Sequence, residues 1–313
     1  MNKNQTSMKP MLAKKLTDIK EDKLEFPYIA QKKYNGVRCM SEFNIYTIES
    51  GFFAQQLPGV MLFSKQGHGY VLNHIIQFLL DFHTAMQYES IMFDGELYVH
   101  GEGINIIKRR IPMVLPSGTI SEPSMDPSVV KFVIYDIYDK NKPDMKQRER
   151  LDLLFQIYKD NIWDKFENVI LAECEEVNNL KDVYNIRDKY ISEGYEGAML
   201  RNKNGIYKST RSKDLLKVKK VHETECIILD IIDDGFKSGR ECIGFILRND
   251  RNDEVFKATP GDLENSWDNE YKRSIFENRK DYIGKLATIS FYERSGIKQV
   301  PFHANVKTIR DYE

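Results

Sequence analysis

The sequence is poor in cysteine and has no long apolar run. It has four cysteines in 313 residues, at positions 39, 174, 226 and 242, and none forms a Cys-x-x-Cys pair. An all-cysteine zinc site is therefore not expected, and four scattered thiols are typical of a reduced, cytoplasmic protein. The uncharged stretch 50–64 is too short and too polar to span a bilayer, and residues 1–10 lack the apolar core of a signal peptide. We therefore expect no membrane association.

The sequence also lacks an excess of charge of either sign. Lys and Arg total 46, Asp and Glu total 47, and the net charge is −1. This balance excludes a uniformly basic nucleic-acid coat, so any anion-binding surface has to come from local patches. The chain has 41% hydrophobic and 12% aromatic residues, enough for substantial cores, and only 18 glycines and 10 prolines. It is therefore not a low-complexity chain, and its length indicates two domains.

The first 220 residues alternate between strand-like and helix-like patterns. Asn35-Gly36, between the apolar runs 28–30 and 37–40, predicts a β-hairpin turn. Apolar residues at helical spacing predict helices over 71–89, 145–161 and 177–193, the last ending at Gly194. Residues 89–98 are interpreted as a strand that enters a turn at Asp94-Gly95. Further strands are expected over 131–138, 198–201 and 215–219.

After residue 220 the pattern changes to short strands separated by turn residues. Strands are expected over 224–232, 243–248, 255–258 and 285–292, with one helix over 262–279. This arrangement is typical of a small barrel of the OB type. We therefore expect an α+β protein with one domain at 1–220 and an OB-fold domain at 221–313.

The hexapeptide Lys33–Arg38 is the most informative short segment. A lysine beside a strand and a glycine turn can be held close to a phosphate, and an unprotonated amine is a good nucleophile. Burial or neighbouring cations favour the unprotonated form of such an amine. Taken alone, the hexapeptide favours a plain hairpin that carries an exposed lysine.

Six segments in order resemble the motifs of the covalent nucleotidyltransferases, which include ATP-dependent DNA ligases, RNA ligases and capping enzymes. Lys33-x-Asn35-Gly36 resembles their K-x-D-G motif. The other five segments are Ser64–Gly67 (S-R-x-G), Phe93–Leu97 (D-G-E), Phe132–Asp136 (aromatic–Asp), Glu196–Arg201 (E-G-x-x-x-[KR]) and Leu216–Lys219 (L-K-x-K). The whole chain resembles a small ATP-dependent DNA ligase of the bacteriophage or viral kind. The resemblance implies a nucleotidyltransferase (adenylation) domain of antiparallel sheets with flanking helices, followed by an OB-fold barrel.

The resemblance also implies a reaction with three phosphoryl transfers. Lys33 attacks the α-phosphate of ATP and forms a lysyl-AMP, AMP moves to the 5′-phosphate of a nick, and the 3′-hydroxyl then displaces AMP. Lys217 and Lys219, which alternate with Val218 along a strand, would neutralise the α-phosphate. Glu196 is assigned to Mg²⁺ (or Mn²⁺), and Glu96 to the ribose and the metal.

The remaining assignments concern the nucleobase and the nick. Tyr135 would stack on adenine, although a core tyrosine is nearly as compatible with its strand, and Gln31 would bind the adenine edge or lie on the surface. Arg38 would reach the ribose or the nicked strand, and Ser64 with Lys65 would bind the 5′-phosphate side of the nick. Lys65 stands where the family usually has Arg, and lysine lacks the bidentate fork of arginine.

Asn35 departs from the family pattern, which has Asp at this position. Asn keeps a carbonyl acceptor but loses the charge, so the efficiency of adenylation is in question. We expect an active DNA ligase, a monomer that acts on nicked duplex DNA in replication, repair or recombination. The alternatives are an RNA ligase or capping-type enzyme, and a catalytically weak protein that only binds nicks.

Overall fold

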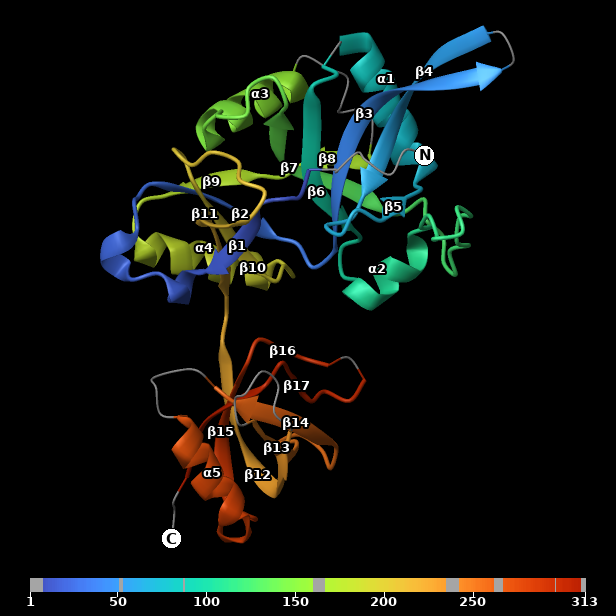
Figure 1. Ribbon diagram of the computed structural model, residues 1–313. Helices are drawn as coiled ribbons and strands as arrows, with labels where there is room; N and C mark the ends of the chain where they lie inside the picture. Colours follow the sequence, from blue (N-terminus) through green and yellow to red (C-terminus); the bar gives the residue numbers. More distant parts are fainter. Residues whose placement is uncertain are drawn as a thin grey trace. The chain divides into compact units, whose positions relative to one another are not determined.

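The computed structural model describes residues 8–50, 53–86, 88–159, 167–234, 242–261, 267–295 and 297–310. The chain divides into two compact units, Met1–Val218 and Lys219–Glu313 (Figure 1). Both units combine β-sheets with a few helices, so the predicted α+β class is confirmed. Among the described residues, no helix combines the length and apolar character that crossing a bilayer requires.

The first unit is built on two β-sheets. The five-stranded sheet runs, from edge to edge, β1 (Leu12–Lys15), β11 (Arg211–Lys219), β10 (Gly197–Asn202), β2 (Tyr28–Lys33) and β9 (Cys174–Val177). The six-stranded sheet runs β5 (Gly69–Tyr70), β4 (Phe53–Phe63), β3 (Val37–Ser50), β6 (Ile91–Tyr98), β7 (Lys131–Asp139) and β8 (Val169–Leu171). The predicted strands 131–138, 198–201 and 215–219 are confirmed, and the strand predicted over 89–98 is β6, which begins at Ile91.

Residues 34–36 carry the chain from one sheet to the other. β2 pairs with β9 and β10, whereas β3 pairs with β4 and β6, so the hairpin predicted from Asn35-Gly36 is wrong. The Asn-Gly signal located the loop correctly, but the strands on either side of it pair with strands of two different sheets and not with each other. A Cβ on Gly36 would lie 2.4 Å from the carbonyl oxygen of Leu97, so glycine is required by this close approach.

The turn expected at Asp94-Gly95 is also wrong, because both residues lie inside β6. The register between β6 and β7 shifts at this point: Asp94 faces Asp136, and Gly95 faces Ile134. Tyr135 is therefore the extra residue of a β-bulge on β7. The irregularity that the sequence pattern indicated is a bulge within a strand pair and not the end of a strand.

The α-helices in the described part of the first unit are α1 (Asn73–Met86), α2 (Ile104–Arg110), α3 (Gln147–Lys159) and α4 (Leu180–Ser192). Helices were predicted over 71–89, 145–161 and 177–193, and α1, α3 and α4 confirm them. The side chain of Asn179 caps the start of α4 by accepting a hydrogen bond from the amide of Asp182. Gly194, which follows its end, has a φ of 89°, as a helix-ending glycine does.

The second unit is a closed five-stranded barrel. Its strands run β12 (His222–Asp233), β13 (Ile243–Arg248), β14 (Val255–Pro260), β18 (Asn305–Ile309) and β15 (Leu286–Phe291) around the barrel. Helix α5 (Asn269–Glu277) and the short pair β16 (Glu293–Arg294) and β17 (Pro301–Phe302) accompany it. Phe245, Ile289 and Val306 fill the barrel and are fully buried, each contributing about 1.5–3 kcal/mol by leaving water. The predicted barrel is confirmed; β18 had no separate prediction.

Candidate active site

Lys33 and Glu196 meet where β2 ends and β10 begins. Lys33 is the last residue of β2 and pairs with Gly197 in the antiparallel ladder, and the amide of Glu196 donates to the carbonyl of Lys33 at 2.9 Å. The Nζ atom of Lys33 forms an ion pair with Oε2 of Glu196, and the two side chains are 20% and 15% exposed. The strand register therefore places the predicted nucleophile in contact with the predicted metal ligand.

The six-stranded sheet brings Glu96, Arg38 and Tyr135 to the same place. Glu96 on β6 lies opposite Arg38 on β3, and the hydroxyl of Tyr135 donates to Oε2 of Glu96 at 3.4 Å. Desolvation raises the pKa of Glu96 to about 7, and the cations Arg38 and Lys33 act against this rise. Glu96 and Lys33 thus interact electrostatically although they come from different sheets.

Arg38 is held in a fixed position by a buried carboxylate. Its Nε and Nη2 atoms donate to the two oxygens of Asp94 at 2.7 and 2.5 Å, and Nη2 also donates to the carbonyl of Met11. Asp94 is fully buried and accepts a further hydrogen bond from the hydroxyl of Tyr207 at 2.7 Å. A bidentate pair of this kind fixes the direction of the guanidinium plane.

Gln31 is fully engaged by protein groups. Its Nε2 donates to the carbonyl of Tyr135 at 3.0 Å and to the sulfur of Cys174 at 3.2 Å, and its Oε1 accepts from Nε of Arg201 at 2.6 Å. The side chain is buried. A contact between Gln31 and a nucleobase therefore requires the exchange of one of these bonds, and the thiol contact is the weakest of them.

Lys217 and Lys219 belong to different compact units. Ala30, Leu200 and Val218 pack against α4 on one face of the five-stranded sheet. Because side chains alternate along strands, Lys33 and Lys217 lie on the opposite face. Lys219 is the first residue of the second unit, where its ammonium lies 5.3 Å from the centre of the Tyr292 ring.

The predicted nick-binding residues form a tight turn after β4. The hydroxyl of Ser64 accepts from the amides of Gln66 and His68 at 3.2 and 3.0 Å, and Gly67 has a φ of 85°. This turn leaves Lys65 exposed while Ser64 is buried. Asn35 lies in the short crossover between the two sheets and is partly exposed.

The predicted metal ligands are the two glutamates, Glu96 and Glu196. In the part of the chain that the structure describes, no group of three or more His, Cys, Asp or Glu side chains is arranged to hold an ion. Mg²⁺ is commonly held by one or two carboxylates together with water and substrate phosphates. Glu96 and Glu196 fit that incomplete kind of site.

A buried polar cluster behind Tyr135 was not predicted from the sequence. Asp136 is fully buried and is ion-paired with both Arg150 and Arg201. Asp136 and Arg201 fell inside quoted motifs without an assigned role. Arg150 on α3 fell outside every motif, because its charged partner Asp136 is 14 residues away in the sequence and lies on β7.

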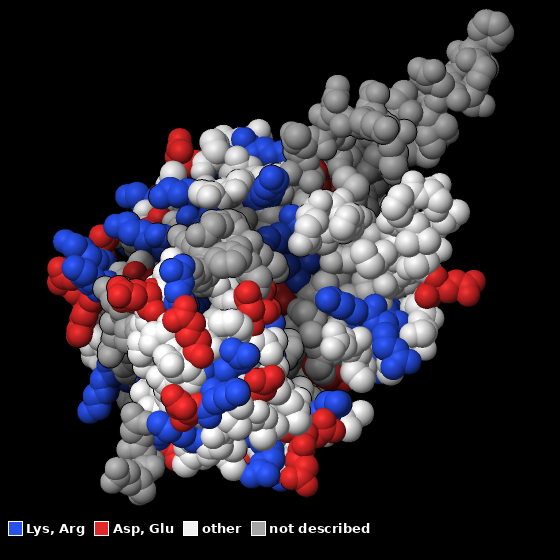
Figure 2. Space-filling view, turned by 60° about the horizontal axis from the view of Figure 1, so that its bottom comes forward, with Lys and Arg blue, Asp and Glu red and all other residues white. Residues whose placement is uncertain are grey.

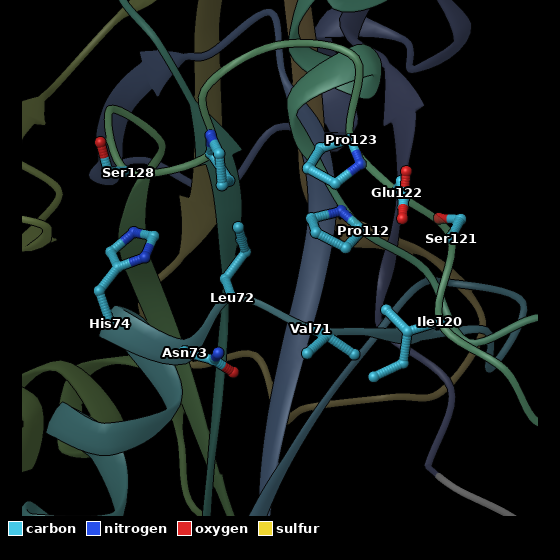
Figure 3. A pocket seen from close by; sticks show the side chains of 11 residues that line it. Val71, Leu72, Asn73, His74, Pro112, Ile120, Ser121, Glu122, Pro123 and Ser128 are labelled. Carbon is cyan, nitrogen blue, oxygen red and sulfur yellow. The ribbon is translucent and has the colours of Figure 1, made fainter.

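Neither the distribution of surface charge nor the pocket described below marks the candidate active site. Figure 2 shows basic and acidic side chains interspersed over one face. A pocket of about 400 Å³ lies elsewhere on the first unit, where Leu72, Pro112 and Pro123 surround it (Figure 3). It contains none of the predicted site residues.

Comparisons with known proteins give the same family as the motifs. The family model of the ATP-dependent DNA ligase domain matches residues 10–219. The DNA ligase of Enterobacteria phage T4 is 29% identical over 307 residues, covering 84% of this chain and 59% of the phage protein. The DNA ligase of African swine fever virus (strain Badajoz 1971 Vero-adapted) is 26% identical over 324 residues, covering 98% of this chain and 70% of the viral protein.

A solved structure from work on Lig E DNA ligases shares the fold. It has a TM-score of 0.65 and 18% identity, and the alignment covers 96% of this chain and 99% of that one. The present chain spans about three-fifths of the length of the T4 relative. Because the family model matches well over half of the sequence, the prediction from the six motifs is confirmed, and the chain belongs to the ATP-dependent DNA ligase domain family.

Proposed function

We propose that this protein is an ATP-dependent DNA ligase that seals nicks in duplex DNA through a lysyl-AMP intermediate. The observation that carries the proposal is the meeting of Lys33, Glu196, Glu96, Arg38 and Tyr135 at the junction of two sheets. All of these residues except Arg38 come from four of the six motifs, and no local turn or helix accounts for their convergence. Residues 1–220 act as the nucleotidyltransferase domain and residues 221–313 as the OB-fold domain.

In the proposed first step, the Nζ atom of Lys33 forms a bond to the α-phosphorus of ATP while the bond to the pyrophosphate oxygen breaks. The ammonium must first lose a proton to water, to which the Lys33 side chain is 20% exposed, and it must separate from the Glu196 carboxylate with which it is paired. Lys217 and Lys219 neutralise the α-phosphate. AMP then passes to the 5′-phosphate at the nick, and the attack of the 3′-hydroxyl releases AMP and closes the strand.

Glu196 and Glu96 are the residues that would hold Mg²⁺, with Mn²⁺ as a substitute. Their carboxylate oxygens are the hard ligands that these ions prefer, and two carboxylates leave room for substrate phosphates. The ion would supply neutralisation of phosphate charge. Two observations support this assignment: Glu196 is ion-paired with Lys33, and the Lys33 cation interacts electrostatically with Glu96.

The remaining residues orient the substrates. Tyr135 stacks on adenine, Arg38 binds the ribose or the nicked strand, and Gln31 binds the adenine edge in exchange for its contact with the Cys174 thiol. Ser64 and Lys65 bind the 5′-phosphate side of the nick. Asn35 supplies a neutral acceptor where the family motif has an acid. The protein acts as a monomer in the cytoplasm of the cell.

A substrate panel separates this proposal from its alternatives. The protein is incubated with α-labelled ATP and Mg²⁺ and then with nicked duplexes in which either strand flank is DNA or RNA. We expect a labelled protein band that disappears in Lys33→Ala, and sealing that is fastest with DNA on both flanks. Preferential sealing of RNA would establish an RNA ligase instead. Nick binding without any labelled protein would establish a catalytically weak nick-binding protein.

A further inference from the structure

Tyr135 is held by its main chain as well as by its ring. It is the extra residue of the bulge on β7, so its carbonyl lies outside the regular β6–β7 pairing. That carbonyl accepts a hydrogen bond from Nε2 of Gln31 at 3.0 Å, which ties the bulge to the other sheet. Bulges of this kind redirect a side chain and occur beside active sites. The direction of the Tyr135 ring therefore depends on the groups that secure the bulge.

The next residue, Asp136, is secured by two buried guanidinium groups. Arg150 donates from Nε and Nη2 to the two oxygens of Asp136 at 2.9 and 3.1 Å, and Arg201 donates from Nη1 at 2.8 Å. Gln147 accepts from Arg150 at 2.6 Å and donates to Asp136 at 3.2 Å. Arg150 and Asp136 are at most 1% exposed. In such a setting, removal of one partner leaves charge uncompensated, so the arrangement has little freedom to change.

The same network reaches the Tyr135 ring. Arg201 donates from Nε to Oε1 of Gln31, and its guanidinium carbon lies 5.1 Å from the ring centre of Tyr135. The guanidinium carbon of Arg38 lies 5.0 Å from that ring centre. Two fixed cations therefore border the ring, one set by Asp94 and the other by Asp136.

We propose that Arg150 is a positioning residue for the nucleotide, which acts through Asp136 and Arg201 to fix the bulge and ring of Tyr135. The inference rests on the proposed function, because it takes Tyr135 as the surface on which the base stacks. Arg150 itself contacts Asp136, Gln147 and the carbonyls of Met145 and Gly205, and it has no proposed contact with ATP. Its guanidinium carbon also lies 5.4 Å from the ring centre of Tyr207, which donates to Asp94, and Arg201 donates to Gln31. The effect that we propose is the one that passes through Tyr135, and the test has to isolate it from these other contacts.

The test is a double-mutant cycle on ATP affinity. Equilibrium binding of ATP is measured for Arg150→Met, Tyr135→Leu and the double variant, all in a Lys33→Ala background so that no transfer takes place. We expect Arg150→Met to weaken ATP binding about tenfold when Tyr135 is present and by less than about twofold when it is Leu. Equal weakening in both backgrounds would overturn the proposal, because a general structural defect does not depend on Tyr135.

Arg110→Met is the matched control. Arg110 also makes a bidentate pair with a carboxylate, Glu102, in the same unit, but it is outside the network around Tyr135. It should leave ATP affinity unchanged. If Arg150→Met does not fold, as judged by circular dichroism, Gln147→Leu takes its place in the cycle with the same two outcomes.

The two proposals fail in different ways. A parent protein that binds ATP but forms no lysyl-AMP would contradict the proposed function alone, since the binding cycle still reports on Arg150. Additive losses in the cycle, with adenylation intact in the parent, would contradict the positioning role alone. A parent that does not bind ATP would overturn both.

Discussion

At the residue scale, the ion pair of Lys33 with Glu196 is the feature of the free protein that bears most directly on the proposed reaction. The Nζ atom of Lys33 is ion-paired with the Glu196 carboxylate, whereas the proposed attack on phosphorus needs its neutral amine. The nucleotide has to change this pairing before transfer begins.

His83 on α1 is a buried residue that the proposed mechanism does not use. Its Nδ1 atom is 2.9 Å from the carbonyl of Tyr88 and donates to it, which leaves Nε2 without a proton. Nε2 is buried and has no hydrogen-bond partner in the described structure. Desolvation lowers the pKa of His83 to about 4, the hydrogen bond to Tyr88 acts against this, and the cation of Lys140 adds to it.

This pKa predicts a loss of stability in acid. The unfolded His83 takes up a proton near its ordinary pKa of 6.5, but the folded one does so only near 4. The contribution of the buried, neutral His83 to the free energy of unfolding is therefore complete above pH 6.5. It falls by up to about 3 kcal/mol as the pH drops towards 4. The free energy of unfolding, measured with urea, should be lower at pH 4.5 than at pH 7.5. We expect this decrease to be about 2 kcal/mol smaller in His83→Gln than in the parent protein. The same difference in both proteins would contradict the prediction.

Single residues divide into those that a sequence pattern can locate and those that it cannot. Lys33, Glu96 and Glu196 stand in short motifs, so the sequence pattern located each of them. The folded structure then brings them together. Arg150 stands in an ordinary amphipathic helix, and its burial follows only from the approach of Asp136 in the folded chain. Local patterns carry no information on such long-range partners.

At the scale of elements, the crossover at 34–36 explains why Lys33 can face residues of both sheets. The chain leaves β2 at Lys33 and enters β3 at Val37 in the other sheet, so the lysine stands at the junction. A hairpin would have kept both strands in one sheet. The Asn-Gly signal depends on local backbone preference, whereas strand pairing depends on distant segments, and for this reason the prediction failed there.

Gly36→Ala tests the close approach at this crossover. The added Cβ would lie 2.4 Å from the Leu97 carbonyl oxygen and 2.7 Å from Cγ of Glu96. We expect a loss of roughly 1–3 kcal/mol in the free energy of unfolding, because neither the backbone nor the site can move freely. Gly103→Ala, where a Cβ meets nothing within 4 Å, should change stability by less than about 0.5 kcal/mol.

Denaturant unfolding of both variants gives these values. Equal stability of Gly36→Ala and the parent would mean that β3 and β6 separate more easily than the structure indicates. We also expect slower adenylation in Gly36→Ala than in Gly103→Ala, because the clash includes the side chain of Glu96.

At the scale of the whole molecule, the chain combines a two-sheet unit with a separate barrel. The change from long mixed patterns to short strands after residue 220 was sufficient to predict a barrel, because strand length and turn spacing are local properties. The closing strand β18 escaped prediction because its residues 305–309 alternate weakly and pair with strands that are distant in the sequence. The domain roles assigned to the two units remain proposals.

The central claim is that one amine, on Lys33, carries AMP. Intact mass spectrometry of the full chain with ATP and Mg²⁺, followed by peptide mapping, tests it most directly. We predict a mass gain of one AMP that maps to Lys33, reverses on addition of pyrophosphate and is absent in Lys33→Ala. A protein that gains no AMP across pH and metal conditions, or that still gains it in Lys33→Ala, would contradict the account.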